Sequence, residues 1–316
     1  MLALALSVAL AFGASVQQPI ATFSIVARDP ATGELGVAVA SRFFAVGSVV
    51  PWAKAGVGAV ATQSFANTTY GPRGLDLLER GATPAQALAI LQRDDGDRDQ
   101  RQVGIVAADG ASITFSGKGC NPWAGGRSGK DYAIQGNILT GEPVVAAMEK
   151  AFLASRGTLA DRLYASLAAG DAAGGDSRGH QSAALLVVKA KAGYGGFSDR
   201  AIDIRVDDHA DPFRELKRLL DYAQMNYAWN EGWTAFTEKR FDAALVAQER
   251  AARLGPQNGE VLYDLAVIRL AAGKRAEALD ALDKALRANP KLATQAKGDK
   301  DLAALRGDPA FEKLAR

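Results

Sequence analysis

The residue with the clearest chemical potential in this sequence is Thr22. A threonine that begins a chain carries two parts of a catalyst, because its hydroxyl is a nucleophile and its own α-amine is a base with an ordinary pKa of about 7.7–8. Here Thr22 opens an apolar run, residues 22–27, directly after a segment that looks removable. The sequence therefore predicts a nucleophile at Thr22 if the chain is cut before it. Threonine also favours β-strands, so a purely structural role is the alternative.

The first 21 residues resemble a secretory signal. Residues 1–14 are almost entirely apolar, and this run is too short to cross a bilayer as a helix. Ala14 or Ala21 could precede a cleavage site, although no Lys or Arg occurs before Arg28. Cleavage after Ala14 would leave residues 15–21 ahead of Thr22, to be removed by self-cleavage or by another protease. We therefore expect a periplasmic or secreted protein.

Composition and charge exclude several classes of function. The chain has 316 residues, enough for one large domain and a smaller one, and a net charge of +2. It has no basic run with interleaved aromatic residues, which argues against nucleic acid as a ligand. Cys120 is the only cysteine, and His180 and His209 are the only histidines, so no internal disulfide and no multi-histidine metal site can form. We predict no metal and no cofactor.

Two features look chemical but favour plain structural roles. Asp95, Asp97 and Asp99 have the spacing of the start of a calcium loop, but Gln100 and Val106 stand where such a loop needs glycine and glutamate. We interpret this run as a solvated helix end. Cys120 is interpreted as a small packed residue rather than a nucleophile.

The pattern of elements predicts an α+β domain over residues 22–208. Strand-like runs occupy residues 22–28, 34–41, 57–64, 102–107, 111–116, 132–138, 182–189 and 201–206. Helical spacing occupies residues 74–81, 84–92, 144–153 and 159–169. This order favours two largely antiparallel sheets with helices outside, a four-layer αββα sandwich. Several strands are apolar on both faces, as expected in the middle of such layers.

The remainder of the chain is helical and carries an internal repeat of 34 residues. Ala244, Ala251 and Pro256 recur at that period as Ala278, Ala285 and Pro290. Gly232 and Ala266 add small residues where paired helices approach closely, and the prolines end the second helix of each pair. The repeat is similar to tetratricopeptide repeats, closed by a degenerate helix at residues 301–314. We predict a leader over residues 1–21, a linker helix over 209–224 and a helical domain over 225–316.

The first domain resembles the DUF1028 family, whose members look like Ntn (N-terminal nucleophile) hydrolases. The resemblance rests on six stretches: residues 22–29 (TFSIVARD), 36–43 (GVAVASRF), 50–63 (VPWAKAGVGAVATQ), 70–74 (YGPRG), 135–137 (QGN) and 174–183 (GGDSRGHQSA). These stretches are specific for membership of the family. They say less about the reaction, because the biochemical role of the family is poorly defined.

The resemblance implies a catalytic arrangement of the proteasome type. That type pairs the terminal threonine with a lysine about 32 residues later, and Lys54 follows Thr22 by 32. A fixed ammonium beside the α-amine would keep the amine neutral and available as a base. The same pattern has an acidic residue before a Ser-Arg pair, but the residue before Ser41 and Arg42 is Ala40. Asp176 is the expected substitute for that carboxylate.

The resemblance also implies a substrate pocket and an oxyanion site. Backbone N–H groups at Gln135, Gly136 and Asn137 would hold the oxyanion, because glycine lets the backbone approach a ligand. The other pocket residues are expected at the end of one strand and in the 174–182 loop: Ser41, Arg42, Arg178, Gln181 and Ser182.

Together these features predict an N-terminal threonine hydrolase that cleaves amide bonds through an acyl-enzyme. Its expected substrate is a peptide or a small amide, and a homo-oligomer is expected. The alternative is an inactive exported binding or scaffold protein, whose repeats hold a peptide, another protein or a second copy of the chain.

Overall fold

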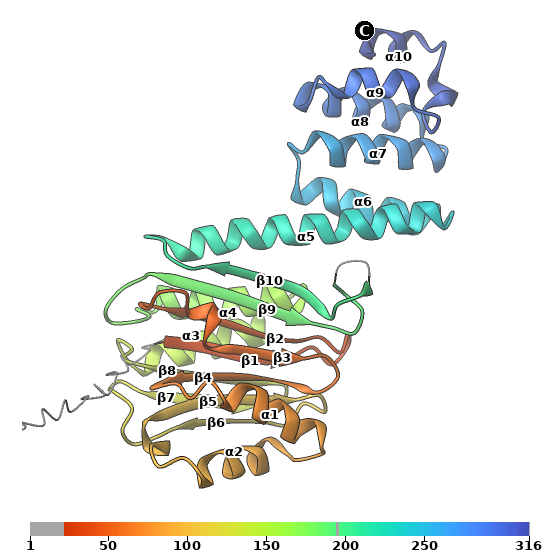
Figure 1. The fold of residues 1–316 in the computed structure, drawn as a ribbon. Helices are drawn as coiled ribbons and strands as arrows, with labels where there is room; N and C mark the ends of the chain where they lie inside the picture. The colour runs from red at the N-terminus through yellow and green to blue at the C-terminus, as the bar shows by residue number, and fades with distance from the viewer. Residues whose placement is uncertain (1–21, 194–195, 316) are drawn as a thin grey trace, which may run out of the picture. The chain divides into compact units, whose positions relative to one another are not determined.

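The computed structural model describes residues 22–193 and 196–315, which divide into two compact units between Phe213 and Arg214 (Figure 1). The division falls in the first turn of helix α5 (Pro212–Thr237). The predicted linker helix, residues 209–224, and the first helix of the repeats therefore lie largely within one continuous helix.

Two antiparallel sheets form the middle of the first unit. The larger has the strand order β10-β9-β2-β1-β8-β7 and the smaller the order β3-β4-β5-β6. The strands are β1 (Thr22–Arg28), β2 (Leu35–Ser41), β3 (Pro51–Lys54), β4 (Gly58–Ser64), β5 (Arg101–Ala107), β6 (Ser112–Ser116), β7 (Gly125–Gly129), β8 (Tyr132–Asn137), β9 (Ser182–Val188) and β10 (Arg200–Val206). Strand β1, which begins at Thr22, thus has a hydrogen-bonded neighbour on each side.

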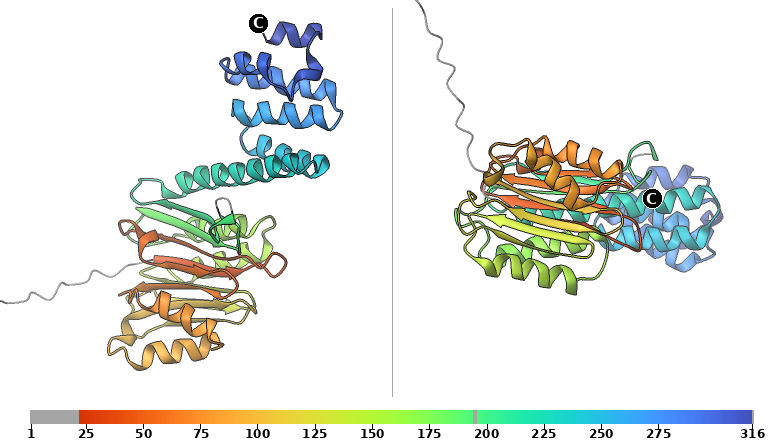
Figure 2. Two further views of the ribbon diagram at one scale, coloured as in Figure 1. Left: turned by 45° about the vertical axis from the view of Figure 1, so that its right-hand side comes forward. Right: turned by 90° about the horizontal axis from the view of Figure 1, so that it is seen from below.

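Helices cover the outer face of each sheet. Helices α1 (Tyr70–Glu79) and α2 (Pro84–Arg93) pack on the smaller sheet, while α3 (Glu142–Ala154) and α4 (Leu159–Ala172) pack on the larger. The view from below shows α1 and α2 in orange along one side and α3 and α4 in yellow-green along the other (Figure 2). The sheets face each other along most of their strands: β3 lies against β2 and β9, β4 against β1 and β2, β5 against β1 and β8, and β6 against β7 and β8. The predicted four-layer αββα order is confirmed.

Local sequence explains these elements. Alternate residues of β2, Leu35, Val37 and Val39, are fully buried in the core between the sheets. Helix α2 begins with a capping box, in which Thr83 and Gln86 satisfy each other's backbone N–H groups, and Pro84 follows at the first helical position. Thr158 and Asp161 cap α4 in the same way.

The prediction missed two strands. Strand β3 has only four residues, too few for a pattern to show. Strand β7 has the sequence Gly-Gly-Arg-Ser-Gly, which reads as a loop, yet it pairs with β8 at the edge of the larger sheet. Edge strands need little side-chain burial, so their sequence signal is weak.

The aspartate run before β5 is only partly solvated, which corrects the interpretation as a solvated helix end. Asp97 and Asp99 are exposed, but the Asp95 side chain is 9% exposed. Its carboxylate accepts hydrogen bonds from Arg101 Nε (2.9 Å), Arg101 Nη2 (3.1 Å) and the Tyr70 hydroxyl (2.8 Å). The Arg101 guanidinium lowers the pKa of Asp95 far below its usual value, and burial raises the pKa of Tyr70. Asp95 therefore ties α1 to β5.

The second unit is helical. It contains most of α5, then α6 (Phe241–Leu254), α7 (Gly259–Ala271), α8 (Arg275–Ala288), α9 (Leu292–Gly298) and α10 (Pro309–Leu314). The small residues of the 34-residue repeat lie between helices, and five of them are fully buried: Ala244, Ala251, Ala266, Ala278 and Ala285. Pro256 and Pro290 follow the ends of α6 and α8. The predicted repeat is confirmed, and the predicted closing segment contains α10.

No helix in the described part of the chain is both long and apolar enough to cross a membrane.

Candidate functional site

Four polar residues form a row across one end of the larger sheet. Thr22 on β1 lies opposite Ser41 on β2 and Asn137 on β8, and Ser41 lies opposite Ser182 on β9. Opposed residues on antiparallel strands place their side chains on the same face. All four residues are at most 3% exposed. The fold thus brings together four residues that the sequence singled out separately.

The hydroxyls in this row have different surroundings. Thr22 Oγ1 donates a hydrogen bond to Ser41 Oγ at 3.1 Å. Ser182 Oγ donates to the Phe43 carbonyl and accepts from the Val46 N–H at 3.2 Å. Ser182 therefore holds the turn that follows β2, whereas Ser41 contacts the proposed nucleophile directly.

Two glutamines of the smaller sheet reach the row from the opposite side. Gln63 Nε2 donates to the Thr22 carbonyl (3.1 Å) and to Gln102 Oε1 (2.9 Å). Gln102 Oε1 also accepts from Asn137 Nδ2 at 2.9 Å, and Gln102 Nε2 donates to the Gly136 carbonyl at 2.7 Å. Both glutamines are fully buried. The prediction missed them, although a glutamine inside an apolar strand signals a buried polar contact.

The Gln135 side chain extends the same network between the two sheets. Its side chain donates to Ser24 Oγ at 2.6 Å and accepts from Thr114 Oγ1 at 3.2 Å. Gly104 on β5 lies directly against it: a Cβ atom at Gly104 would be 2.2 Å from Gln135 Oε1. A side chain at position 104 would therefore force the end of the Gln135 side chain to move.

Replacing Gly104 by alanine will destabilise the first unit by about 1–3 kcal/mol, because the added methyl group displaces the Gln135 side chain from its hydrogen bonds. Urea unfolding monitored by fluorescence measures the change. Gly96→Ala is the matched control, since a Cβ there meets no atom within 4 Å. Equal unfolding midpoints for the two variants would contradict the close approach at Gly104.

Two of the three expected oxyanion donors, Gln135 and Gly136, lie where the strand is paired on both sides, which corrects that part of the prediction. Gln135 and Gly136 are paired with β1 on one side and with β7 on the other. In a strand paired on both sides the main-chain N–H groups bond to neighbouring strands. What this segment offers the site is the side chain of Asn137.

Asp176 organises the loop beside the row instead of supplying a free carboxylate. It accepts hydrogen bonds from the Arg42 N–H and the Arg178 N–H, both at 2.9 Å, and from the Arg178 guanidinium at 3.0 and 3.1 Å. Its side chain is 1% exposed. Arg42 also bonds the Arg178 carbonyl at 2.7 Å. Gln181 bonds Asp208 instead of any member of the row.

Lys54 lies away from Thr22, contrary to the role expected from its spacing. Its ammonium pairs with both carboxylate oxygens of Glu79 at 2.6 Å, and the side chain is 48% exposed. Lys54 lies opposite Gly58, five residues along β4 from Gln63, which touches Thr22. At about 3.3 Å per residue that separation is about 17 Å, too far for a lysine side chain.

Neither a metal site nor a reactive thiol emerges from the described residues. Among them, no group of His, Cys, Asp and Glu side chains is arranged to hold a metal ion. Burial raises the pKa of the Cys120 thiol, and its Sγ donates to the Arg101 carbonyl at 3.4 Å. A thiol with a raised pKa is a poor nucleophile.

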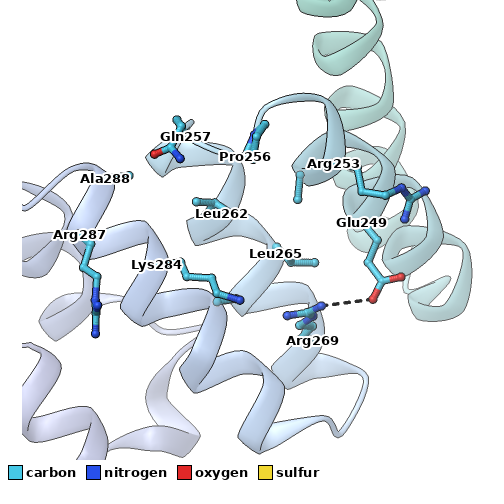
Figure 3. A pocket seen from close by; sticks show the side chains of 12 residues that line it. Glu249, Arg253, Pro256, Gln257, Leu262, Leu265, Arg269, Lys284, Arg287 and Ala288 are labelled. Atoms are coloured by element: carbon cyan, nitrogen blue, oxygen red, sulfur yellow. Dashed lines mark hydrogen bonds and ion pairs between the residues drawn. The ribbon is translucent and has the colours of Figure 1, made fainter.

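A groove of about 750 Å³ lies in the second unit, between α6 and α8 with α7 as its floor (Figure 3). Leu262 and Leu265 form the apolar floor. Four cationic residues line it, Arg253, Arg269, Lys284 and Arg287, against one acidic residue, Glu249, which pairs with Arg269. Its lining is therefore predominantly basic.

Comparisons with known proteins match the two units of the chain to two different families. A family model described as a family of unknown function, DUF1028, matches residues 22–216, and a tetratricopeptide-repeat model matches residues 235–299. The chain is similar to the crystal structure of a DUF1028-family protein from Silicibacter pomeroyi, with 31% identity and a TM-score of 0.59 over 65% of this chain and 86% of that one. No curated protein matches. The chain belongs to the DUF1028 family and carries tetratricopeptide-type repeats after its DUF1028 domain.

Proposed function

We propose that this protein is an N-terminal threonine hydrolase of the Ntn type, which cleaves amide bonds of peptides or small amides through an acyl-enzyme. The observation that carries the proposal is the place of Thr22. It is the first residue of a central strand, and its hydroxyl is hydrogen-bonded to Ser41 within a row of buried polar side chains. A nucleophile needs such an oriented hydroxyl and a base within reach.

The base in this proposal is the α-amine of Thr22 itself. Thr22 Oγ1 attacks the substrate carbonyl, and its proton passes to the amine. For this transfer the Thr22 hydroxyl turns its single proton from Ser41 toward the amine, and Ser41 then donates to Oγ1, because a hydroxyl can accept one hydrogen bond and donate another. With Lys54 distant, the apolar surroundings of β1 are proposed to keep the amine neutral, because desolvation lowers the pKa of an amine.

The mechanism requires that the chain be cut between Ala21 and Thr22. N-terminal sequencing and intact mass of the protein purified from its native host test this requirement. We expect a mature chain that begins at Thr22 and is recovered from the periplasm or the medium, because residues 1–21 resemble an export signal. A mature chain that begins at Ser15, or at Met1, would contradict the hydrolase mechanism.

The second candidate is a binding or scaffold protein, and the basic groove on the repeats favours it. An apolar floor with a cationic rim suits an acidic peptide or protein segment. In this candidate Thr22 is a structural strand residue, and a retained leader would be compatible with function. The same N-terminal measurement therefore discriminates between the two candidates.

A further inference from the structure

The side chain of Asn137 is only half satisfied. Asn137 is 0% exposed, and its Nδ2 donates to Gln102 Oε1, but its Oδ1 has no hydrogen-bond partner among the described residues. An unpaired buried carbonyl oxygen is destabilising, so such atoms are rare unless they serve a ligand or a reacting group.

The orientation of this amide is fixed by its neighbours. Gln102 Nε2 faces two main-chain carbonyls, those of Gly136 (2.7 Å) and Gly125 (3.3 Å), which can only accept hydrogen bonds. The opposite end of Gln102 must therefore be its oxygen, and it is this oxygen that faces Asn137. Asn137 accordingly presents its nitrogen to Gln102, which leaves its oxygen as the unpaired atom.

Thr22 is the group best placed to supply a donor. It lies directly opposite Asn137 on the adjacent strand, where Cα atoms are about 4.5–5.5 Å apart and side chains share one face. A peptide nitrogen carries one N–H, whereas the α-amine of a chain that begins at Thr22 carries two or three. Cleavage before Thr22 thus creates new donors beside an oxygen that has no partner in the described part of the chain.

We propose that Asn137 Oδ1 accepts a hydrogen bond from the α-amine of mature Thr22 and stabilises that amine when it becomes an ammonium. This inference rests on the proposed function. As Thr22 Oγ1 bonds to the carbonyl carbon, the hydroxyl proton passes to the amine. When the carbon–nitrogen bond of the substrate breaks, the ammonium returns that proton to the leaving nitrogen. Asn137 is then a positioning residue, held by Gln102. It stabilises the positive charge of the Thr22 ammonium, the group on which Lys54 was expected to act.

The pKa of the Thr22 amine reports this contact without any substrate. The chain beginning at Thr22 is made by cutting a fusion protein directly before that residue. Competitive trace acetylation with acetic anhydride across a pH series, with the N-terminal peptide quantified by mass spectrometry, gives the pKa. Asn137→Asp should raise the pKa of the amine by about 1–3, because a carboxylate favours the ammonium form. Asn137→Ala should lower it, because the ammonium loses its acceptor.

Asn230→Asp is the matched control, since it adds the same charge on an exposed residue of α5 and should leave the pKa unchanged. If Asn137→Asp does not fold, Asn137→Ala still tests the contact. An unchanged pKa in both Asn137 variants would overturn the proposal. A Thr22 amine that acetic anhydride does not acetylate at any pH would overturn it as well. Shifted pKa values without hydrolysis of any amide would sink the proposed function and leave the contact standing. Hydrolysis of an amide without a shift in the pKa of the amine would support the proposed function and overturn the contact with Asn137.

Discussion

Replacing Thr22 by alanine will reduce the proposed amide hydrolysis, in a chain that begins at residue 22, about 10³-fold or more, to the background rate, because the change removes the proposed attacking oxygen. Thr22→Ser keeps the hydroxyl and should retain a measurable part of the activity. The measurement is turnover of a panel of simple amides and peptides by the three proteins, each beginning at residue 22.

The control for this experiment is the stability of the fold. Thr22 lies within the ladder of β1, and its main-chain hydrogen bonds do not depend on its side chain. Thr22→Val, which matches threonine in shape but has no hydroxyl, should therefore fold normally and be inactive. Activity of the valine variant near that of the native protein would show that the hydrolytic group lies elsewhere.

Replacing Asp95 by alanine will lower the free energy of unfolding of the first unit by about 3–5 kcal/mol. The reason is that Arg101, whose side chain is 10% exposed, would keep a buried positive charge with its main partner gone. Tyr70 and Asn67 would also lose an acceptor. Asp97→Ala is the matched control, because the Asp97 side chain is 66% exposed and should matter little. Urea unfolding of both variants measures the difference.

Because of the same ion pair, Asp95–Arg101, we expect the first unit to lose stability in acid. The Arg101 guanidinium lowers the pKa of Asp95 in the folded protein, while in the unfolded chain the pKa is about 3.9. The stability contributed by Asp95 is therefore fully present above the unfolded value and is lost as the pH falls through the lower, folded value. The loss of unfolding free energy between pH 5 and pH 2 should be smaller in Asp95→Ala than in the native protein. Equal slopes for the two proteins would contradict this assignment.

Local patterns predicted much of the fold, because its helices and strands follow the periodicity of their apolar residues. The 34-residue repeat could be found because Ala244 and Ala278 occupy equivalent buried positions on α6 and α8, in successive helix pairs. The αββα order followed from the alternation of strands and helices. Strand β7 could not be found this way, since an edge strand of glycines has no burial pattern.

The site was predicted less well, because its contacts depend on how the two sheets are aligned. Thr22, Ser41 and Asn137 are neighbours only through strand register. Lys54 has the expected spacing along the chain, yet β3 ends beside Gly58 and carries the lysine to the far end of its sheet. Gln63 and Gln102 contact the row across the space between the sheets, which no local pattern encodes.

The position of β1 in the middle of its sheet has a consequence for any chain that begins at Thr22. Chain ends usually fray, because their last residues have few hydrogen bonds and many accessible conformations. This end would be clamped between β2 and β8, so that a terminus behaves like the interior of a strand. The conformational entropy of ordering the nucleophile and its amine would then be lost once, on folding, and would not recur with each substrate that binds.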